Sequence, residues 1–120
     1  MIKPKLSLNV TGTFHNNDDG ISRQAILKRT KEGENIILAH IPIEQDTNAV
    51  AVFRMNGEQI GWLHRSTARI IASLLDSKRI INAEIEEISG ESSLECRIAI
   101  VSPDIIAELK SGYEQLQKRE

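Results

Sequence analysis

The chain has 120 residues, 40% of them hydrophobic, which fits one domain with a packed core and excludes global disorder. It carries 15 basic and 17 acidic residues, and this net charge of −2 argues against a protein that coats nucleic acid by charge alone. No apolar run approaches the ~20 residues of a membrane span. Residues 1–5 lack the apolar stretch of a signal peptide, so we expect a cytoplasmic protein.

The charge is unevenly distributed along the chain. Residues 1–79 hold eleven basic and eight acidic residues, a balance of +3, whereas residues 80–120 hold four basic and nine acidic residues, a balance of −5. A polyanion is therefore expected to bind the first part of the chain, and repulsion from the last part limits the strength of that binding.

In chain order, the first elements are strands separated by polar turns. Alternating apolar residues predict a strand over 6–11 that ends at Gly12, and a polar loop follows it. Ser22 is the expected N-cap of a short helix. Two further strands are predicted over 34–41 and 48–55.

Asn56-Gly57 is the strongest hairpin signal in the sequence and predicts a two-residue type I′ turn into a fourth strand over 58–63. Such a turn sets Met55 opposite Glu58, Phe53 opposite Ile60, Val52 opposite Gly61 and Ala51 opposite Trp62. Both faces of the hairpin are then fairly apolar. Such a hairpin suits a closed or half-closed barrel better than a sheet with one solvent-exposed face.

The second half adds a helix over 66–76 with one apolar stripe, strands over 81–86 and 94–101, and a last helix that starts at Ser102-Pro103. The order predicts an α+β, mostly β fold with two to three short helices. We place a soft boundary here, with a barrel domain over 1–102 and a C-terminal helix over 103–120. The apolar face of that helix is expected to hold Ile106, Leu109, Tyr113 and Leu116. It can pack on its own barrel or on a second copy of the chain.

Cysteine and histidine give no sign of a metal centre. Cys96 is the only cysteine, which excludes an intrachain disulfide and a zinc site built on thiolates. It lies in an alternating apolar pattern and is expected to be a small core residue of a strand. His15, His40 and His64 do not have ligand spacing, so we expect neither a metal nor another cofactor.

Three segments of the chain resemble the HIRAN domain. They are Val10-Thr11-Gly12-Thr13-Phe14, the D-x-N-A-φ-x-V pattern of residues 46–52, and residues 56–63 with the helix that follows. The stretch Ser22-Arg23-Gln24 is similar to the bacterial form, which often stands alone or sits in mobile-element proteins. The resemblance covers about residues 7 to 101.

The resemblance implies a modified OB-like barrel that binds DNA. The family is best known at the front of SWI/SNF-type DNA translocases that remodel stalled replication forks, where the domain captures the 3′ end of single-stranded DNA. It implies that Phe14 and His15 stack on the DNA, that Asp46 lies at the terminal nucleotide and that Trp62 lines the pocket. DNA-end readers usually have two tyrosines in place of Phe14-His15, N-P-Y in place of residues 43–45, and proline in place of His64.

Several of these residues have a second interpretation. Asp46 can accept a hydrogen bond from a terminal hydroxyl, or it can form an Asx-turn before the third strand. Asn48 is a ligand contact or a brace for that turn. Trp62 is a pocket residue or a core residue across from Ala51. Phe14 opens a polar loop, and we expect it to contact the ligand.

The cations near the expected pocket are Arg23, His64, Arg65 and Arg69. Arg65 and Arg69 lie one helical turn apart and are suited to successive phosphates, although a solvated helix face explains them equally well. The other aromatic residues, Phe53 and Tyr113, are expected to pack in the interior. No Ser-His-Asp or Cys-His spacing indicates an activated nucleophile, so we expect no enzymatic activity.

The sequence therefore predicts a non-enzymatic module for single-stranded DNA or its 3′ end, in DNA repair or replication-fork processing, with a helicase or nuclease as partner. The alternative is a protein-interaction or adaptor module on the same scaffold, and the C-terminal helix is then the expected surface of a homodimer.

Overall fold

The computed structural model describes residues 4–118, with side chains through residue 112, and consists of six strands and three helices. The strands are β1 (Leu6–Thr11), β2 (Asn35–His40), β3 (Val50–Arg54), β4 (Gln59–Leu63), β5 (Ala83–Ser89) and β6 (Glu95–Ile100). The helices are α1 (Arg23–Lys28), α2 (Arg65–Asp76) and α3 (Pro103–Lys118). This is the order of elements that the sequence predicts.

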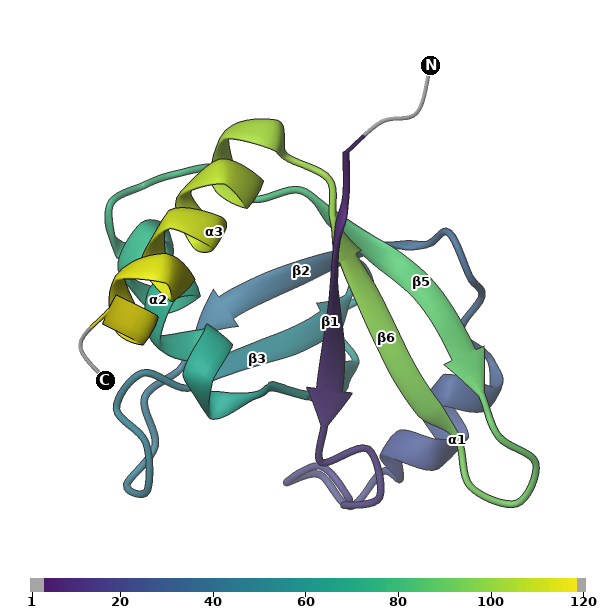
Figure 1. Cartoon of the computed structure of the whole chain (residues 1–120). Helices are drawn as coiled ribbons and strands as arrows, with labels where there is room; N and C mark the ends of the chain where they lie inside the picture. The colour runs from purple at the N-terminus through teal and green to yellow at the C-terminus, as the bar shows by residue number, and fades with distance from the viewer. Residues whose placement is uncertain (1–3, 119–120) are drawn as a thin grey trace.

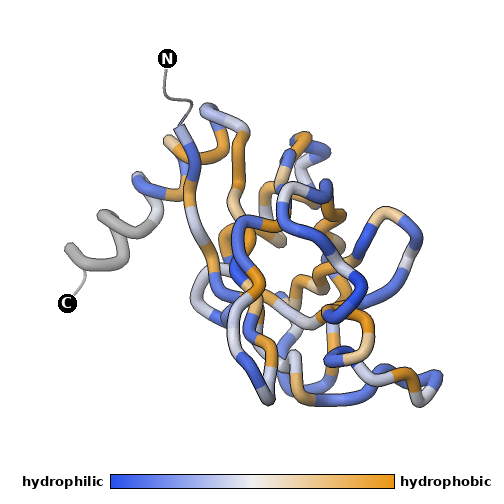
Figure 2. Tube along the Cα trace, turned by 90° about the vertical axis from the view of Figure 1, so that its right-hand side faces the viewer, coloured by the Kyte–Doolittle hydropathy of each residue, from blue (hydrophilic) through white to orange (hydrophobic). Residues whose placement is uncertain are grey.

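The strands form one closed antiparallel barrel in the order β1-β4-β3-β2-β5-β6, and β6 pairs back to β1. Helices α2 and α3 lie next to one another on one side of the barrel, and α1 lies on the opposite side (Figure 1). Hydrophobic and hydrophilic residues alternate along β1, whereas β3 begins with four hydrophobic residues in a row. Hydrophobic stretches recur along the chain between hydrophilic ones (Figure 2). The predicted small barrel is thus confirmed.

The core of the described residues is aliphatic. Every strand contributes to it, as do residues of all three helices such as Ile26, Ile71 and Ile105. Cys96 is 4% exposed within it, and this burial raises the pKa of its thiol to about 12. The prediction of a small core cysteine is confirmed, since such a thiol is not ionised at neutral pH.

The β3–β4 hairpin differs from the prediction by one loop residue. The backbone N–H of Arg54 donates to the oxygen of Glu58 at 2.8 Å, and the N–H of Gly57 donates to the oxygen of Arg54 at 2.9 Å. Gly57 has a φ of +92°, whereas Asn56 has no positive φ. The loop is therefore a three-residue turn that closes on a left-handed glycine, and the type I′ prediction is wrong.

The extra loop residue changes the register near the turn. Phe53 pairs with Gln59 and not with Ile60, after a bulge between Val52 and Phe53. The predicted pairs Ala51 with Trp62 and Val52 with Gly61 are confirmed. The bulge lies between these pairs and the turn, and it compensates there for the one-residue change in register. Asn56 explains the turn type, since its Oδ1 accepts from the N–H of Glu58 at 3.0 Å.

A close approach between β1 and β4 depends on Gly61. A Cβ at this position would lie 2.7 Å from Val10 Cγ1 and would also meet the carbonyl oxygen of Thr11. Only glycine leaves room for this backbone contact. The contact sets the end of β1, and the loop that follows it, directly beside β4.

Helix α3 packs on its own barrel through its first half. Ile105, Ile106 and Leu109 are buried and belong to the same core cluster as the strands. This part of the apolar face is therefore used within the chain. The side chains of Tyr113 and Leu116, which the sequence assigns to the same face, lie outside the described residues. The domain boundary at Ser102-Pro103 stays a prediction.

Because Leu109 is 0% exposed, we expect Leu109→Ala to lower the free energy of unfolding by about 2–5 kcal/mol through the cavity that it leaves. Its exposed neighbour Lys110 offers a matched control, and Lys110→Ala should change stability by no more than about 0.5 kcal/mol. Chemical denaturation measures both variants. Equal, small effects would show that α3 does not contribute to the core.

Candidate nucleic-acid interface

Strand β4 organises the candidate site because it pairs with β1 on one side and with β3 on the other. Trp62 lies opposite Thr11 of β1 and opposite Ala51 of β3. Directly after β4, His64 starts helix α2. Strand β4 therefore positions both the loop after β1, which carries Phe14, and the loop before β3, which carries Asp46.

Gly12 lies at the centre of the first group of predicted site residues. With a φ of +73°, it turns the chain out of β1. A Cβ at Gly12 would lie 3.2 Å from Arg23 Nη1, 3.5 Å from Trp62 Cδ1 and 3.8 Å from His15 Cδ2. The glycine thus lets Arg23, Trp62 and His15 gather around the end of β1.

Arg23 holds this loop in place. It is 7% exposed, its Nη1 donates to the carbonyl oxygen of Gly12 at 2.9 Å and its Nε donates to Asn17 Oδ1 at 2.7 Å. Asn17 in turn donates to the backbone oxygen of Gln59 in β4 at 2.9 Å. Burial lowers the pKa of the Arg23 guanidinium. Its side chain is therefore used inside the loop, away from the surface where a phosphate would bind.

The aromatic side chains of the described residues all lie outside the core cluster. Phe14 is 59% exposed, and Trp62 and Phe53 are half-buried. The expectation that Phe53 packs in the core is wrong, because it follows the core residue Val52 on β3 and strand alternation places it on the other face. Trp62 is likewise not a member of the core cluster.

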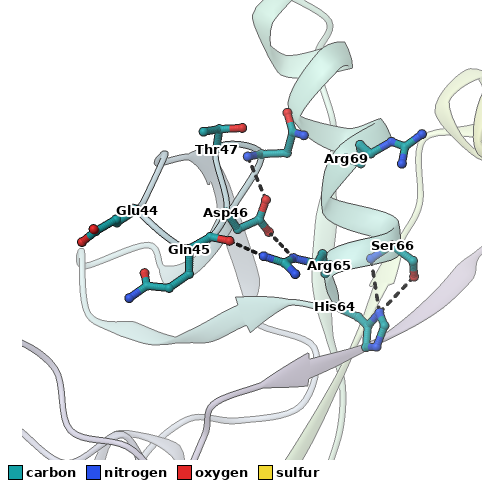
Figure 3. A pocket seen from close by; sticks show the side chains of 9 residues that line it. Glu44, Gln45, Asp46, Thr47, His64, Arg65, Ser66 and Arg69 are labelled. Atoms are coloured by element: carbon teal, nitrogen blue, oxygen red, sulfur yellow. Dashed lines mark hydrogen bonds and ion pairs between the residues drawn. The ribbon is translucent and has the colours of Figure 1, made fainter.

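The second group of predicted residues lines one hollow of about 580 Å³ between the loop before β3 and the start of α2. Figure 3 shows these side chains around it. The hollow is lined by Glu44, Gln45, Asp46, Thr47, Asn48, His64, Arg65, Ser66 and Arg69. Five of the nine predicted site residues thus come together, from segments that are far apart in the sequence.

Asp46 organises the loop side of the hollow. Its Oδ1 accepts from the N–H of Asn48 at 3.0 Å, which is the predicted Asx-turn. Its Oδ2 lies 3.6 Å from Arg65 Nε. A carboxylate offers about four lone-pair directions, so Asp46 can accept a further hydrogen bond from a ligand. The side-chain amide of Asn48 makes no hydrogen bond to the described residues and does not brace the turn.

The helix side of the hollow is the first turn and a half of α2. His64 is the N-cap, and its Nδ1 accepts from the backbone N–H of Ser66 at 3.3 Å. Arg65 donates to the carbonyl oxygen of Gln45 and pairs with Asp46, as Figure 3 shows. The guanidinium of Arg69, exposed on the next turn, has no hydrogen-bond or ion-pair partner among the described residues.

The sequence assigns no role to His40, at the end of β2, because it lacks the spacing of a metal ligand. In the structure its Nδ1 lies 2.9 Å from Asp76 Oδ1, and its Nε2 lies 2.8 Å from the carbonyl oxygen of Thr47. The hydrogen bond to Asp76, and then the one to Thr47, raise the pKa of His40. Asp76 is 36 positions from His40 in the sequence and Thr47 is 7 positions from it, and neither spacing corresponds to a recognisable sequence motif.

Gln24 is the other residue that sequence reasoning missed. Its side chain donates to the backbone oxygens of Thr13 and Leu94 and accepts from the N–H of Leu94 at 2.7 Å. It thereby fixes the loop after β1 to the start of β6.

No group of three or more His, Cys, Asp or Glu side chains in the described part of the chain could hold a metal ion. No described helix has the length and hydropathy needed to span a membrane.

Comparison with known proteins decides the family. The model of the HIRAN domain matches residues 6–103, most of the chain. The chain belongs to the HIRAN domain family. A search of curated proteins finds no significant match.

Solved structures share the HIRAN fold. The crystal structure of the HIRAN domain of human HLTF has a TM-score of 0.62 at 20% identity, over 95% of this chain and 87% of that one. A solution structure of the same HLTF domain has a TM-score of 0.56 at 22% identity, over 96% of this chain and 87% of that one. A crystal structure of a protein from Lactobacillus plantarum has a TM-score of 0.57 at 17% identity, over 82% of this chain and 96% of that one.

We expect Arg23→Ala to leave the Gly12 oxygen and Asn17 Oδ1 without their donors and to lower the free energy of unfolding by about 1–3 kcal/mol. NMR signals of residues 12–17 should shift with it. Lys28→Ala, at an exposed position of the same helix, is the control. Unchanged stability and unchanged loop signals would contradict this role of Arg23.

Proposed function

We propose that this HIRAN domain is a non-enzymatic module that binds single-stranded DNA at its 3′ end. The observation that carries the proposal is the hollow between residues 44–48 and the start of α2, which gathers Asp46, Asn48, His64, Arg65 and Arg69. Its residues supply hydrogen-bond acceptors, a free amide and two guanidinium groups. A strand end offers the matching set of a hydroxyl, a base edge and phosphates.

The charge of the hollow supports phosphate contacts on the helix side. Arg69 is unpaired among the described residues, and the side chain of Arg65 is 69% exposed in its contact with Asp46. An exposed ion pair of this kind contributes only about 0–1 kcal/mol, so a phosphate can replace Asp46 as the partner of Arg65 at small cost. Both arginines are then suited to successive phosphates, as their spacing on the helix indicates.

The aromatic residues support base stacking beside the hollow. A small domain usually buries its aromatic side chains, yet Phe14 and Trp62 lie outside the core. Trp62 of β4 lies beside Gly12 at the start of the loop that carries Phe14, and it is two residues before His64, which lines the hollow. Single-strand binders use such aromatic surfaces for bases of any sequence.

Asp46 supports discrimination between chain ends. A carboxylate accepts a hydrogen bond from a free 3′-hydroxyl but repels a terminal phosphate. We propose this role for Asp46 together with its structural role in the Asx-turn, since the two use different lone pairs.

An adaptor function is the second candidate. It is favoured by a separate hollow of about 370 Å³ along the β2–β5 side of the barrel, where the exposed apolar residues Ile37 and Met55 lie beside the polar Asn35 and Asn82. A cytoplasmic location, a helicase or nuclease partner, a role in DNA repair and self-association through α3 stay predictions.

For the first test, we expect fluorescence anisotropy at low salt to show saturable binding of a short oligonucleotide with a 3′-hydroxyl, and weaker binding of the same strand with a 3′-phosphate. Phe14→Ala should cost about 1–3 kcal/mol through the loss of one stacked base. Asp46→Ala should remove the preference for the hydroxyl. Met55→Ala, which truncates an exposed apolar side chain at the hairpin, is the control. Binding weaker than about 100 µM, the weak limit of non-specific DNA binding, would rule out the proposal in favour of the adaptor function.

For the second test, the salt dependence of binding counts the phosphate contacts. If Arg65 and Arg69 neutralise two phosphates, the slope of log Kobs against log salt should be about −1.4, and Arg69→Ala should reduce it by about 0.7. Lys28→Ala removes an exposed charge from α1 and should leave the slope unchanged. The same slope in Arg69→Ala as in the parent protein would exclude Arg69 from the interface.

A further inference from the structure

His40 lies outside the hollow but contacts both of the segments that form its walls. It ends β2, and its ring lies between Thr47 and the last residue of α2, Asp76. Thr47 lines the hollow between Asp46 and Asn48, and the first turns of α2 form the opposite wall. The side chain of His40 therefore connects the ligand-facing loop to the helix that faces it.

Both ring nitrogens of His40 face acceptors that carry no hydrogen. Nδ1 lies 2.9 and 3.1 Å from the two carboxylate oxygens of Asp76, and Nε2 lies 2.8 Å from the carbonyl oxygen of Thr47. A neutral imidazole has one N–H and can satisfy only one of these groups. The imidazolium has two and satisfies both. The positions of the two acceptors therefore suit the protonated ring.

The charges around the ring agree with this protonation state. Asp76 acts on it from α2, and Asp46 acts on it from the loop. On the β3 side its pairing partner is Val50, which carries no charge. The raised pKa of His40 follows from the same contacts. The two-point contact is therefore complete below the pKa of an ordinary histidine, about 6.5, and is lost as the pH rises through the raised pKa of His40.

We propose that His40 is a positioning residue of the hollow, and that its protonation orders the loop at Thr47 and thereby couples ligand binding to pH. The coupling to binding rests on the proposed function, whereas the ordering of the loop does not. Loss of a proton from His40 releases one of its two contacts. When the contact to Thr47 is lost, the loop keeps its contacts to Arg65 at the start of α2 but loses its link to the far end of that helix.

The loop part of the proposal is tested by NMR on the full chain without DNA, between about pH 5.5 and about pH 8.5, on both sides of the ordinary histidine pKa. We expect the backbone amide signals of Thr47 and Asn48 to shift with the same midpoint as the His40 ring. Asp76→Asn should move both midpoints to lower pH, and His40→Gln should abolish the shift. His15→Gln, at an exposed histidine with no side-chain partner among the described residues, is the control and should change neither midpoint. If the amide signals of Thr47 and Asn48 do not change as His40 titrates, the positioning role is overturned.

The coupling is tested by titrating a 3′-hydroxyl oligonucleotide at the two ends of this pH range. We expect the affinity of the parent protein to fall with rising pH by about fivefold more than that of His40→Gln, the lower end of typical coupling between two sites. Asp76→Asn should shift the midpoint of this fall as it shifts the ring titration, which a purely structural defect would not do. Equal pH dependence in the parent protein and in His40→Gln would overturn the coupling and leave the proposed function intact. No binding by any variant would overturn the proposed function, and the loop signals would still decide whether His40 orders the loop.

Discussion

The contact between β1 and β4 at Gly61 is the constraint on which the rest of the site depends. Because this residue has no side chain, the backbone of Thr11 lies directly against β4, and the next residue, Gly12, can turn out of the barrel beside Trp62. The other edge of β4 holds β3 and, through it, the loop of Asp46. A larger residue at position 61 would separate β1 from β4, and the stacking loop would lose its fixed position relative to the hollow.

The barrel fixes the loops mainly with polar side chains that are buried or half-buried, whereas its aromatic side chains lie outside the core. Arg23 and Gln24 use their side chains to hold the loop after β1, and Asp46 and His40 do the same for the loop before β3. Each of these groups places neighbouring side chains at the surface. The aliphatic core has no aromatic member among the described residues, and Phe14 is exposed while Trp62 and Phe53 are half-buried. The aliphatic core and the proposed stacking surface therefore use different kinds of residue.

The residues that hold a loop and those proposed to touch the ligand are partly the same. Asp46 closes the Asx-turn and pairs with Arg65, and it is also the proposed contact of the terminal hydroxyl. The ligand can therefore exchange partners within an existing network rather than order a free loop. His40 extends this network to the far end of α2, which is why a single proton can affect a hollow that it does not line.

The sequence by itself determined the elements, the buried face of most strands and five of the residues that meet in the hollow, because strand periodicity and turn chemistry are local properties. It also determined the family, since the three matching segments are short and continuous. The hairpin register differs from the prediction through a local contact, in which Asn56 accepts from the N–H of Glu58 and favours a three-residue turn. The tertiary structure alone decided that the Arg23 side chain is buried beneath the loop after β1 and that His40 lies between Asp76 and Thr47. These facts depend on contacts between segments that only barrel closure brings together, and no spacing along the chain encodes them.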